Sequence, residues 1–223
     1  MIPLFPLGNV LFPGVHLPLH IFEDRYRDLV RTLVSCDDEA QRRFGVVAIR
    51  QGWEVGGDAA RALYPVGCVA RLRTVNQHPD GRYDIVVVGG RRFRLGAVDA
   101  SQRPYLLGEV ELLPPDPPAD ATGQVLAGSV GSLFAEYVSL VAAARRGPHD
   151  PGQLPDDPTV LSYLVAAGAL LTLEDRQTLL EAADTTARLR AELRLLKREV
   201  TMLRSLRVVP APLSDLQVPT GLN

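Results

Sequence analysis

Cysteine and lysine are both scarce in this sequence. The two cysteines, Cys36 and Cys68, lie far apart and have no second pair of ligands near them, which excludes a disulfide scaffold and a cysteine-rich zinc cluster. Lys197 is the only lysine, and it lies between Leu196 and Arg198 in a charged run where an exposed ion pair is expected. A phosphate-binding loop of the Walker type needs a lysine after its glycines, and a Ser-Lys peptidase dyad needs a lysine in a pocket. Neither arrangement is present, so we predict no catalytic residues and no enzymatic activity.

The sequence also lacks a strong charge of one sign. Its formal net charge is -2 at pH 7, which argues against a chain-wide attraction to nucleic acid or to an anionic membrane. We find neither a signal-peptide pattern nor an uninterrupted apolar run long enough to span a bilayer. We therefore expect a cytoplasmic protein with no membrane contact and no cofactor. The 223 residues, 46% of them hydrophobic, can form one large core or one core and a smaller helical domain.

The first thirty residues change their periodicity once. Four prolines interrupt the short apolar runs between Ile2 and Ile21, so this stretch predicts brief extended pieces and turns. From Asp24 onward, apolar residues return every three or four positions, which predicts one amphipathic helix. The residues on its apolar face are Tyr26, Leu29, Val30, Leu33 and Val34.

Short β-branched runs dominate the rest of the first half. Strands are expected at 44–49, 66–75, 83–88, 92–95 and 106–113. The turn at 78–81 contains proline, aspartate and glycine, and it predicts a hairpin. Gly89 and Gly90 predict a bend between two of the strands. Five or more short strands with glycine corners indicate a strongly bent sheet or an open barrel.

The second half has the pattern of a helical domain. The run Pro114–Pro118 predicts a stiff spacer, and a helix is expected over 120–146. Asp157 and Pro158 have the pattern of a helix start, and Thr172 begins a capping pattern for a long helix to Leu206. The chain is thus divided into a β-rich part (1–113), a proline-rich linker (114–119), a helical part (120–207) and a tail (208–223).

A heptad-like apolar stripe runs from Leu179 to Leu203 along the last expected helix. A parallel dimer would use this stripe. The interruption at Thr186 and the short span favour packing on neighbouring helices of the same chain. We predict a monomer, or a weak dimer through the 179–203 helix.

The proline-interrupted start and the helix after it resemble the amino-terminal, substrate-binding domain of Lon proteases. The resemblance is closest to small stand-alone bacterial proteins that lack the ATPase and peptidase modules. It extends through Asp80-Gly81-Arg82, through 89–94 and Pro104-Tyr105, and into the helices from Leu173 to Leu189. It implies an α+β fold, in which a PUA-like bent β-sheet or pseudo-barrel precedes a carboxy-terminal α-helical bundle with one long helix.

The resemblance also implies a function. It implies a non-catalytic module that recognises unfolded or exposed apolar polypeptide segments, as an adaptor or regulator in protein quality control beside a separate protease or chaperone. Such recognition needs an apolar concavity with a usable sheet edge. The candidate residues are Phe5, Phe12, Phe22 and Tyr26, which could instead belong to the core.

RNA binding is the alternative function, because PUA-like barrels include RNA binders. It would use the basic face formed by Arg91, Arg92 and Arg94. Strand alternation predicts that Phe93 faces inward and that Arg92 and Arg94 face outward. A solvated sheet face is the simpler account of these arginines.

Two histidines and a carboxylate near the amino terminus are candidate metal ligands by residue type. His16 and His20 are four residues apart, with Glu23 close by. Pro18 lies between the histidines, and no second pair of ligands is recognisable. No metal site is predicted from this spacing.

Overall fold

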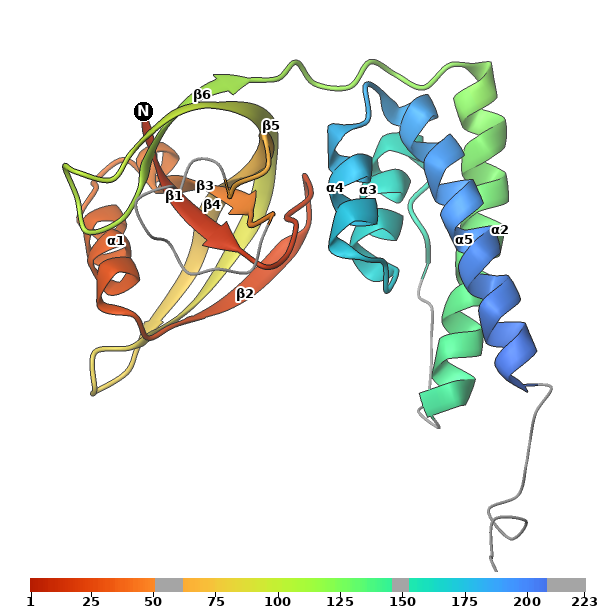
Figure 1. Ribbon diagram of the computed structural model, residues 1–223, viewed down its shortest axis with the longest axis horizontal. Coiled ribbons are helices and arrows are strands. Elements are labelled where there is room, and N and C mark those ends of the chain that lie inside the picture. The colour runs from red at the N-terminus through yellow and green to blue at the C-terminus, as the bar shows by residue number, and fades with distance from the viewer. Residues whose placement is uncertain (51–61, 146–152, 208–223) are drawn as a thin grey trace, which may run out of the picture.

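A strand-rich part that includes helix α1 precedes a helical part in the computed structural model, which describes residues 1–50, 62–145 and 153–207 (Figure 1). The predicted α+β class is confirmed. The strands are β1 (Ile2–Leu7), β2 (His16–Ile21), β3 (Arg43–Ala48), β4 (Val66–Gln77), β5 (Tyr83–Asp99) and β6 (Leu107–Leu112). The helices are α1 (Asp24–Val34), the 3-10 turn η1 (Glu39–Gln41), α2 (Ala121–Arg145), α3 (Pro158–Gly168), α4 (Leu173–Glu181) and α5 (Thr185–Arg207). The predicted tail, 208–223, lies outside the described residues.

The strands form a bent sheet that closes on itself. Their order is β2-β5-β4-β3-β1-β6, and β5 also pairs with β6, so five strands make a ring to which β2 is added at one side. β1 runs parallel to β3, and every other pairing in the described sheet is antiparallel. β5 can serve both neighbours because it is long: its first half pairs with β2 and its last part with β6.

The predicted bend at Gly89 and Gly90 is wrong as a strand end, because β5 continues through both glycines. The reason for glycine at position 89 is instead a close approach of two backbones. A Cβ atom on Gly89 would lie 2.0 Å from the carbonyl oxygen of Phe12. Only a residue without a side chain lets the segment after β1 cross the strand at this point.

The barrel and the helices each have their own hydrophobic core, and a further core contains residues of both parts. α1 packs Tyr26, Leu29, Val30 and Leu33 on the barrel interior, as its periodicity predicts, but Val34 at its end is exposed. α2, α3 and α5 bury the heptad-like stripe within the chain, including Leu189, Leu196 and Val200. This stripe is therefore not free to form a dimer seam, and the oligomeric state stays a prediction. Phe12 of the barrel part packs near Tyr163 of α3 in the core between the two parts.

Asp116 in the proline-rich linker holds the two parts together. Its carboxylate is buried and accepts hydrogen bonds from Arg92 of β5, at 2.5 Å, and from Arg188 of α5. The hydroxyl of Tyr163 also donates to it, at 3.1 Å, and the Arg188 guanidinium lies over the Tyr163 ring. The linker is thus fixed to both parts through Asp116, in addition to separating them.

The prediction of a single long helix from Thr172 to Leu206 is wrong, because the helix is interrupted between α4 and α5. Arg92 explains the break. Its guanidinium donates to the carbonyl oxygens of Leu180 and Ala182, at 2.7 and 2.6 Å, where the carbonyls at the end of α4 have no helical partner. Asp184 then accepts the amide of Ala187 at 2.8 Å and starts α5.

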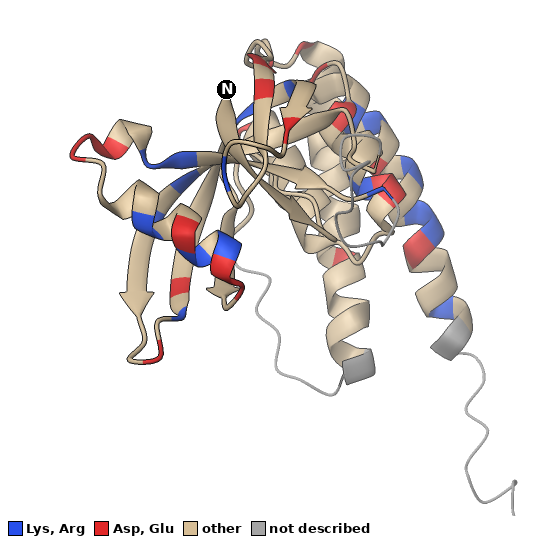
Figure 2. Cartoon of the chain, turned by 60° about the vertical axis from the view of Figure 1, so that its left-hand side comes forward, with Lys and Arg blue, Asp and Glu red and all other residues tan. Residues whose placement is uncertain are grey.

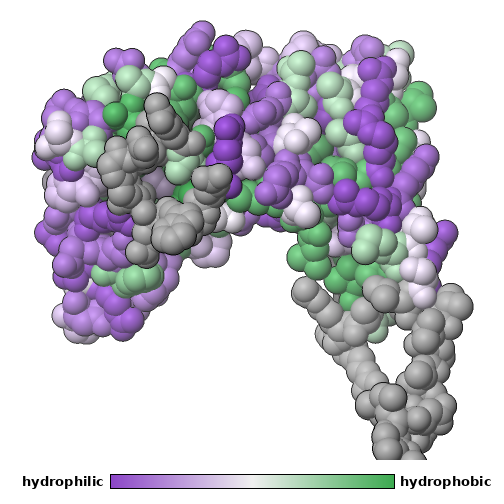
Figure 3. Space-filling view, in the orientation of Figure 1, coloured by the Kyte–Doolittle hydropathy of each residue, from purple (hydrophilic) through white to green (hydrophobic). Residues whose placement is uncertain are grey.

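α2 differs from expectation in its apolar character. Residues Ala121–Ala143 have the length and composition of a membrane-crossing helix, with a mean hydropathy of 1.6, whereas the sequence pattern predicts no such run. α2 packs on α3 and α5, but only 28% of this apolar window is buried in the described structure. Apolar residues are also exposed on the helical part, as Figure 3 shows; among them are Val125, Val160 and Leu170.

Candidate functional site

A pocket of about 450 Å³ opens at the side of the barrel where two strands face each other without pairing. Residues 5–8 of β1 and the following turn form one wall, and residues 19–23 at the end of β2 form the other. Arg25, Tyr26, Ile49, Arg50 and Leu173 complete the lining. We call this pocket the β1–β2 groove.

The β2 wall carries an unpaired backbone edge among the described residues. The amide of Gly89 donates to the carbonyl of Val15 at 2.9 Å, so the backbone groups of Val15 point toward β5. Because backbone groups alternate along a strand, those of His16, Pro18 and His20 point away from β5. Proline at the middle position agrees with this, since a residue without an amide proton is tolerated on a free edge.

The β1 wall is also partly unpaired within the described structure. Only Ile2 and Pro3 pair with β6, while residues 4–7 pair with β3 on the other side. The amide of Leu4 still donates to Leu106, at 2.8 Å. Beyond Leu4, the edge of β1 faces the groove.

The floor of the groove is aromatic. Phe5 and Tyr26 stack with ring centroids 4.1 Å apart, and both are buried. Burial raises the pKa of the Tyr26 hydroxyl, so the ring is uncharged at neutral pH. Arg25 lies over the Tyr26 ring at 4.7 Å and also pairs with Glu23 at 2.7 Å. The rim therefore carries a mutually neutralised pair of charges beside an apolar floor.

The four apolar candidates from the sequence divide between two places. Phe5, Phe22 and Tyr26 line the groove, and Phe22 is 62% exposed at its rim. Phe12 does not line it, because this ring is buried in the core between barrel and helices. Sequence reasoning missed Leu173, which reaches the groove from the helical part and carries no local signal of doing so.

The basic face proposed for RNA does not form as expected. Phe93 faces inward as predicted, but Arg92 is buried, because the linker and the end of α4 cover the outer side of β5 at this point. Arg91 donates to the carbonyl of Leu113 at 2.9 Å, and Arg94 is exposed. Figure 2 shows acidic and basic residues interspersed along α1 and α5.

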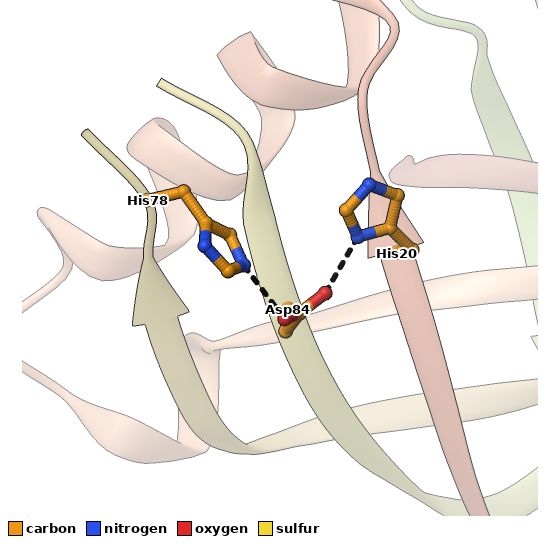
Figure 4. Close-up of side chains that lie close together, drawn as sticks. All are labelled: His20, His78 and Asp84. Carbon is orange, nitrogen blue, oxygen red and sulfur yellow. Dashed lines mark hydrogen bonds and ion pairs between the residues drawn. The ribbon is translucent and has the colours of Figure 1, made fainter. Parts of the chain in front are cut away.

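His20 has different neighbours from those that its spacing indicates. It lies directly opposite Asp84 in the pairing of β2 with β5, and its Nδ1 is 2.6 Å from Asp84 Oδ1. His78, from the turn after β4, places Nε2 at 2.7 Å from Asp84 Oδ2 (Figure 4). Hydrogen bonds from the two histidines lower the pKa of Asp84. His16 and Glu23 are not part of this cluster.

Comparisons with known proteins agree with this architecture. The family model described as "ATP-dependent protease La (LON) substrate-binding domain" matches residues 1–198. A Lon protease 2 of Syntrophobacter fumaroxidans is 32% identical over 83% of this chain and 23% of its own length. A Lon protease 1 of Thermus thermophilus is 30% identical over 89% of this chain and 25% of its own length. The chain thus spans about a quarter of the length of these relatives.

A solved structure is similar over nearly its whole length. The crystal structure of a Lon N-terminal domain protein from Xanthomonas campestris has a TM-score of 0.62 and 26% identity. The match covers 88% of this chain and 96% of that one.

Proposed function

The chain belongs to the family of Lon substrate-binding domains, and we propose that it binds exposed apolar segments of unfolded polypeptides in the β1–β2 groove. Family membership makes it a substrate-recognition module. The family model that matches residues 1–198 describes a substrate-binding domain alone. The activities of whole Lon proteases are therefore not assigned to these residues.

One observation carries the choice of the groove: an unpaired strand edge lies beside an apolar floor. An extended peptide gains affinity from main-chain hydrogen bonds to a free edge, and specificity from pockets that accept alternate side chains. The outer edge of β2 offers the backbone groups of His20 at the groove, and those of His16 farther along the strand. Phe5, Tyr26 and Phe22 offer the apolar contact.

The charges around the groove favour an apolar client over a strongly charged one. Arg25 is already paired with Glu23, and Arg50 lies over the ring of Tyr64 at 5.0 Å. Each arginine side chain is thus already in contact with another group, Arg25 with a carboxylate and Arg50 with an aromatic ring. Binding is accordingly expected to depend on apolar area and main-chain pairing, both of which tolerate salt.

The test is fluorescence anisotropy with two labelled probes, a reduced and alkylated unfolded polypeptide and a single-stranded RNA, each at low and moderate salt. We expect saturable, salt-tolerant binding of the polypeptide. RNA binding would weaken steeply with salt because phosphate contacts release counterions. Binding of RNA alone would refute the proposal.

A finer proposal concerns the fate of a bound polypeptide. The module would act in the cytoplasm as an adaptor or regulator that delivers bound chains to a protease or chaperone. The support is that the relatives are named Lon proteases and match this chain over about a quarter of their length. Degradation of a labelled unfolded polypeptide by the organism's own ATP-dependent protease should change when the purified chain is added. An unchanged degradation rate at saturating concentrations of the chain would contradict delivery. Polypeptide binding itself is tested separately by the anisotropy experiment.

A further inference from the structure

We propose that His20, His78 and Asp84 form a site for a divalent transition-metal ion, with Zn²⁺ as the reference ion (Figure 4). Each residue offers one ligand atom, and these atoms all lie within 4.8 Å of one another. The proposal does not depend on polypeptide binding.

The backbone holds the three residues together without help from an ion. His20 and Asp84 are direct partners in the β2–β5 pairing, so their side chains leave the same face of the sheet. The turn that carries His78 is closed by two hydrogen bonds: His78 N–H donates to Arg82 at 2.8 Å, and Gly81 N–H donates to His78 at 2.9 Å. Gly81 has a φ of +84°, which suits glycine. The arrangement is therefore already assembled before any ion binds.

The donor set suits zinc and related ions. Two imidazole nitrogens and a carboxylate are typical ligands of Zn²⁺, Cu²⁺, Ni²⁺ and Fe²⁺, whereas Mg²⁺ and Ca²⁺ prefer oxygen alone. With three protein ligands, a fourth position stays open to water, as in zinc sites that are not fully enclosed.

The geometry requires only small side-chain movements. Around a tetrahedral zinc ion with bonds of about 2.0–2.1 Å, ligand atoms lie roughly 3.4 Å apart. The contacts of Asp84 with His20, at 2.6 Å, and with His78, at 2.7 Å, would lengthen by less than about 1 Å. The widest separation in the set, within 4.8 Å, would close by up to about 1.4 Å. The three side chains are 33% to 50% exposed, which leaves them room to turn and leaves the site open to an incoming ion.

Arg82 lies beside His20, and metal binding changes which nitrogen of the His20 ring carries the proton. Arg82 Nη1 lies 3.4 Å from His20 Nε2, and Arg82 is also paired with Asp80 at 2.6 Å. If Nε2 accepts a hydrogen from Arg82, then Nδ1 carries the ring proton and donates it to Asp84. An ion bound at Nδ1 moves that proton to Nε2, and the long contact with Arg82 is lost. Arg82 keeps its pairing with Asp80, so the change leaves no charge buried or unpaired.

The position of the site gives the ion a structural effect. β2 pairs with β5 but with no other strand in the described sheet, and His20 is a residue of β2. An ion would join β2 to β5 and to the turn after β4. It would thereby fix the outermost strand of the barrel.

Calorimetric titration of the full chain with ZnCl₂ tests the proposal. We expect one zinc ion per chain with micromolar or tighter affinity. Because loss of an outer-shell partner alone costs about 10- to 100-fold in metal affinity, His78→Ala and Asp84→Asn should each weaken binding by about 100-fold or more. His16→Ala is the matched control, since His16 is an exposed histidine on the same face of β2 but outside the cluster. It should bind zinc like the unaltered chain.

Thermal unfolding with zinc or with a chelator supplies an independent readout. Zinc should raise the melting temperature of the unaltered chain and of His16→Ala, but not that of Asp84→Asn. A cluster held only by hydrogen bonds would lose stability in Asp84→Asn equally with zinc and with chelator. That result, the absence of saturable zinc binding, or binding abolished by Cys36→Ser and retained by Asp84→Asn would each overturn the proposal.

Discussion

Phe22 is an exposed aromatic side chain at the rim of the β1–β2 groove, and its replacement by serine is expected to weaken polypeptide binding without unfolding the barrel. Full burial of a phenylalanine side chain contributes about 1.5–3 kcal/mol. Phe22 is 62% exposed, so burial of this exposed fraction under a bound polypeptide contributes about 1–2 kcal/mol to binding. This corresponds to a loss of about five- to thirtyfold in affinity for Phe22→Ser.

Anisotropy titration of a labelled unfolded polypeptide measures this loss. Leu170→Ser is the matched control, because Leu170 is 59% exposed on the helical part and does not line the groove. The control should keep the affinity of the unaltered chain, and both variants should keep its melting temperature. Equal affinity of Phe22→Ser and the unaltered chain, or an equal loss in Leu170→Ser, would refute the assignment of the groove.

Three further predictions concern the framework that supports the groove. Arg92→Met should lower the free energy of unfolding by about 3–5 kcal/mol in urea titrations, because it removes one partner of a buried ion pair and uncaps the end of α4. Gly89→Ala should lower the free energy of unfolding by about 3 kcal/mol or more, since its Cβ would collide with the carbonyl of Phe12. Gly128→Ala, in the exposed part of α2 with open space around it, should instead raise the free energy of unfolding by about 0.5–1 kcal/mol. Burial raises the pKa of Glu192 well above its usual value, so its folded form holds the proton more tightly and stability should fall as the pH rises from the unfolded-state pKa of about 4.3 toward neutral. Glu192→Gln should flatten this decline in denaturation curves measured across that range, and a decline that survives the substitution would count against the cause.

The parts of the fold that the sequence predicts well are those with local causes. Asp157 followed by Pro158 predicts a helix start, and the Asp157 carboxylate does accept the amides of Thr159 and Val160, at 2.8 and 2.9 Å. The period of α1 likewise depends on neighbours within one helix. Capping and periodicity act over a few residues, so they can be read before the fold is known.

The parts that the sequence does not predict depend on distant partners. The break between α4 and α5 is stabilised by Arg92, which lies 90 residues before Ala182. That same contact buries Arg92, so one long-range interaction explains two wrong expectations. The apolar period across the break is continuous enough to indicate a single helix. The one local signal of the break is Asp184, an N-cap residue, whereas the contact of Arg92 with the end of α4 has no local pattern.

The candidate site shows the same division. Aromatic residues near the amino terminus point to the groove because three of them belong to one short stretch of chain. Leu173 joins them only through the packing of α4 against the barrel. His20 meets Asp84 across 64 positions, through strand register, whereas the sequence spacing draws attention to His16.

Amide chemical-shift mapping of the ¹⁵N-labelled chain with an unfolded, apolar peptide shows where on the molecule a polypeptide binds. We predict that the largest changes fall on residues 19–23 and on Phe5, Leu7 and Gly8, with the amides of His16 and His20 shifting as a strand adds to the edge of β2. Largest changes on α2 or α3, or on residues 91–94, with the groove unaffected, would contradict binding in the β1–β2 groove.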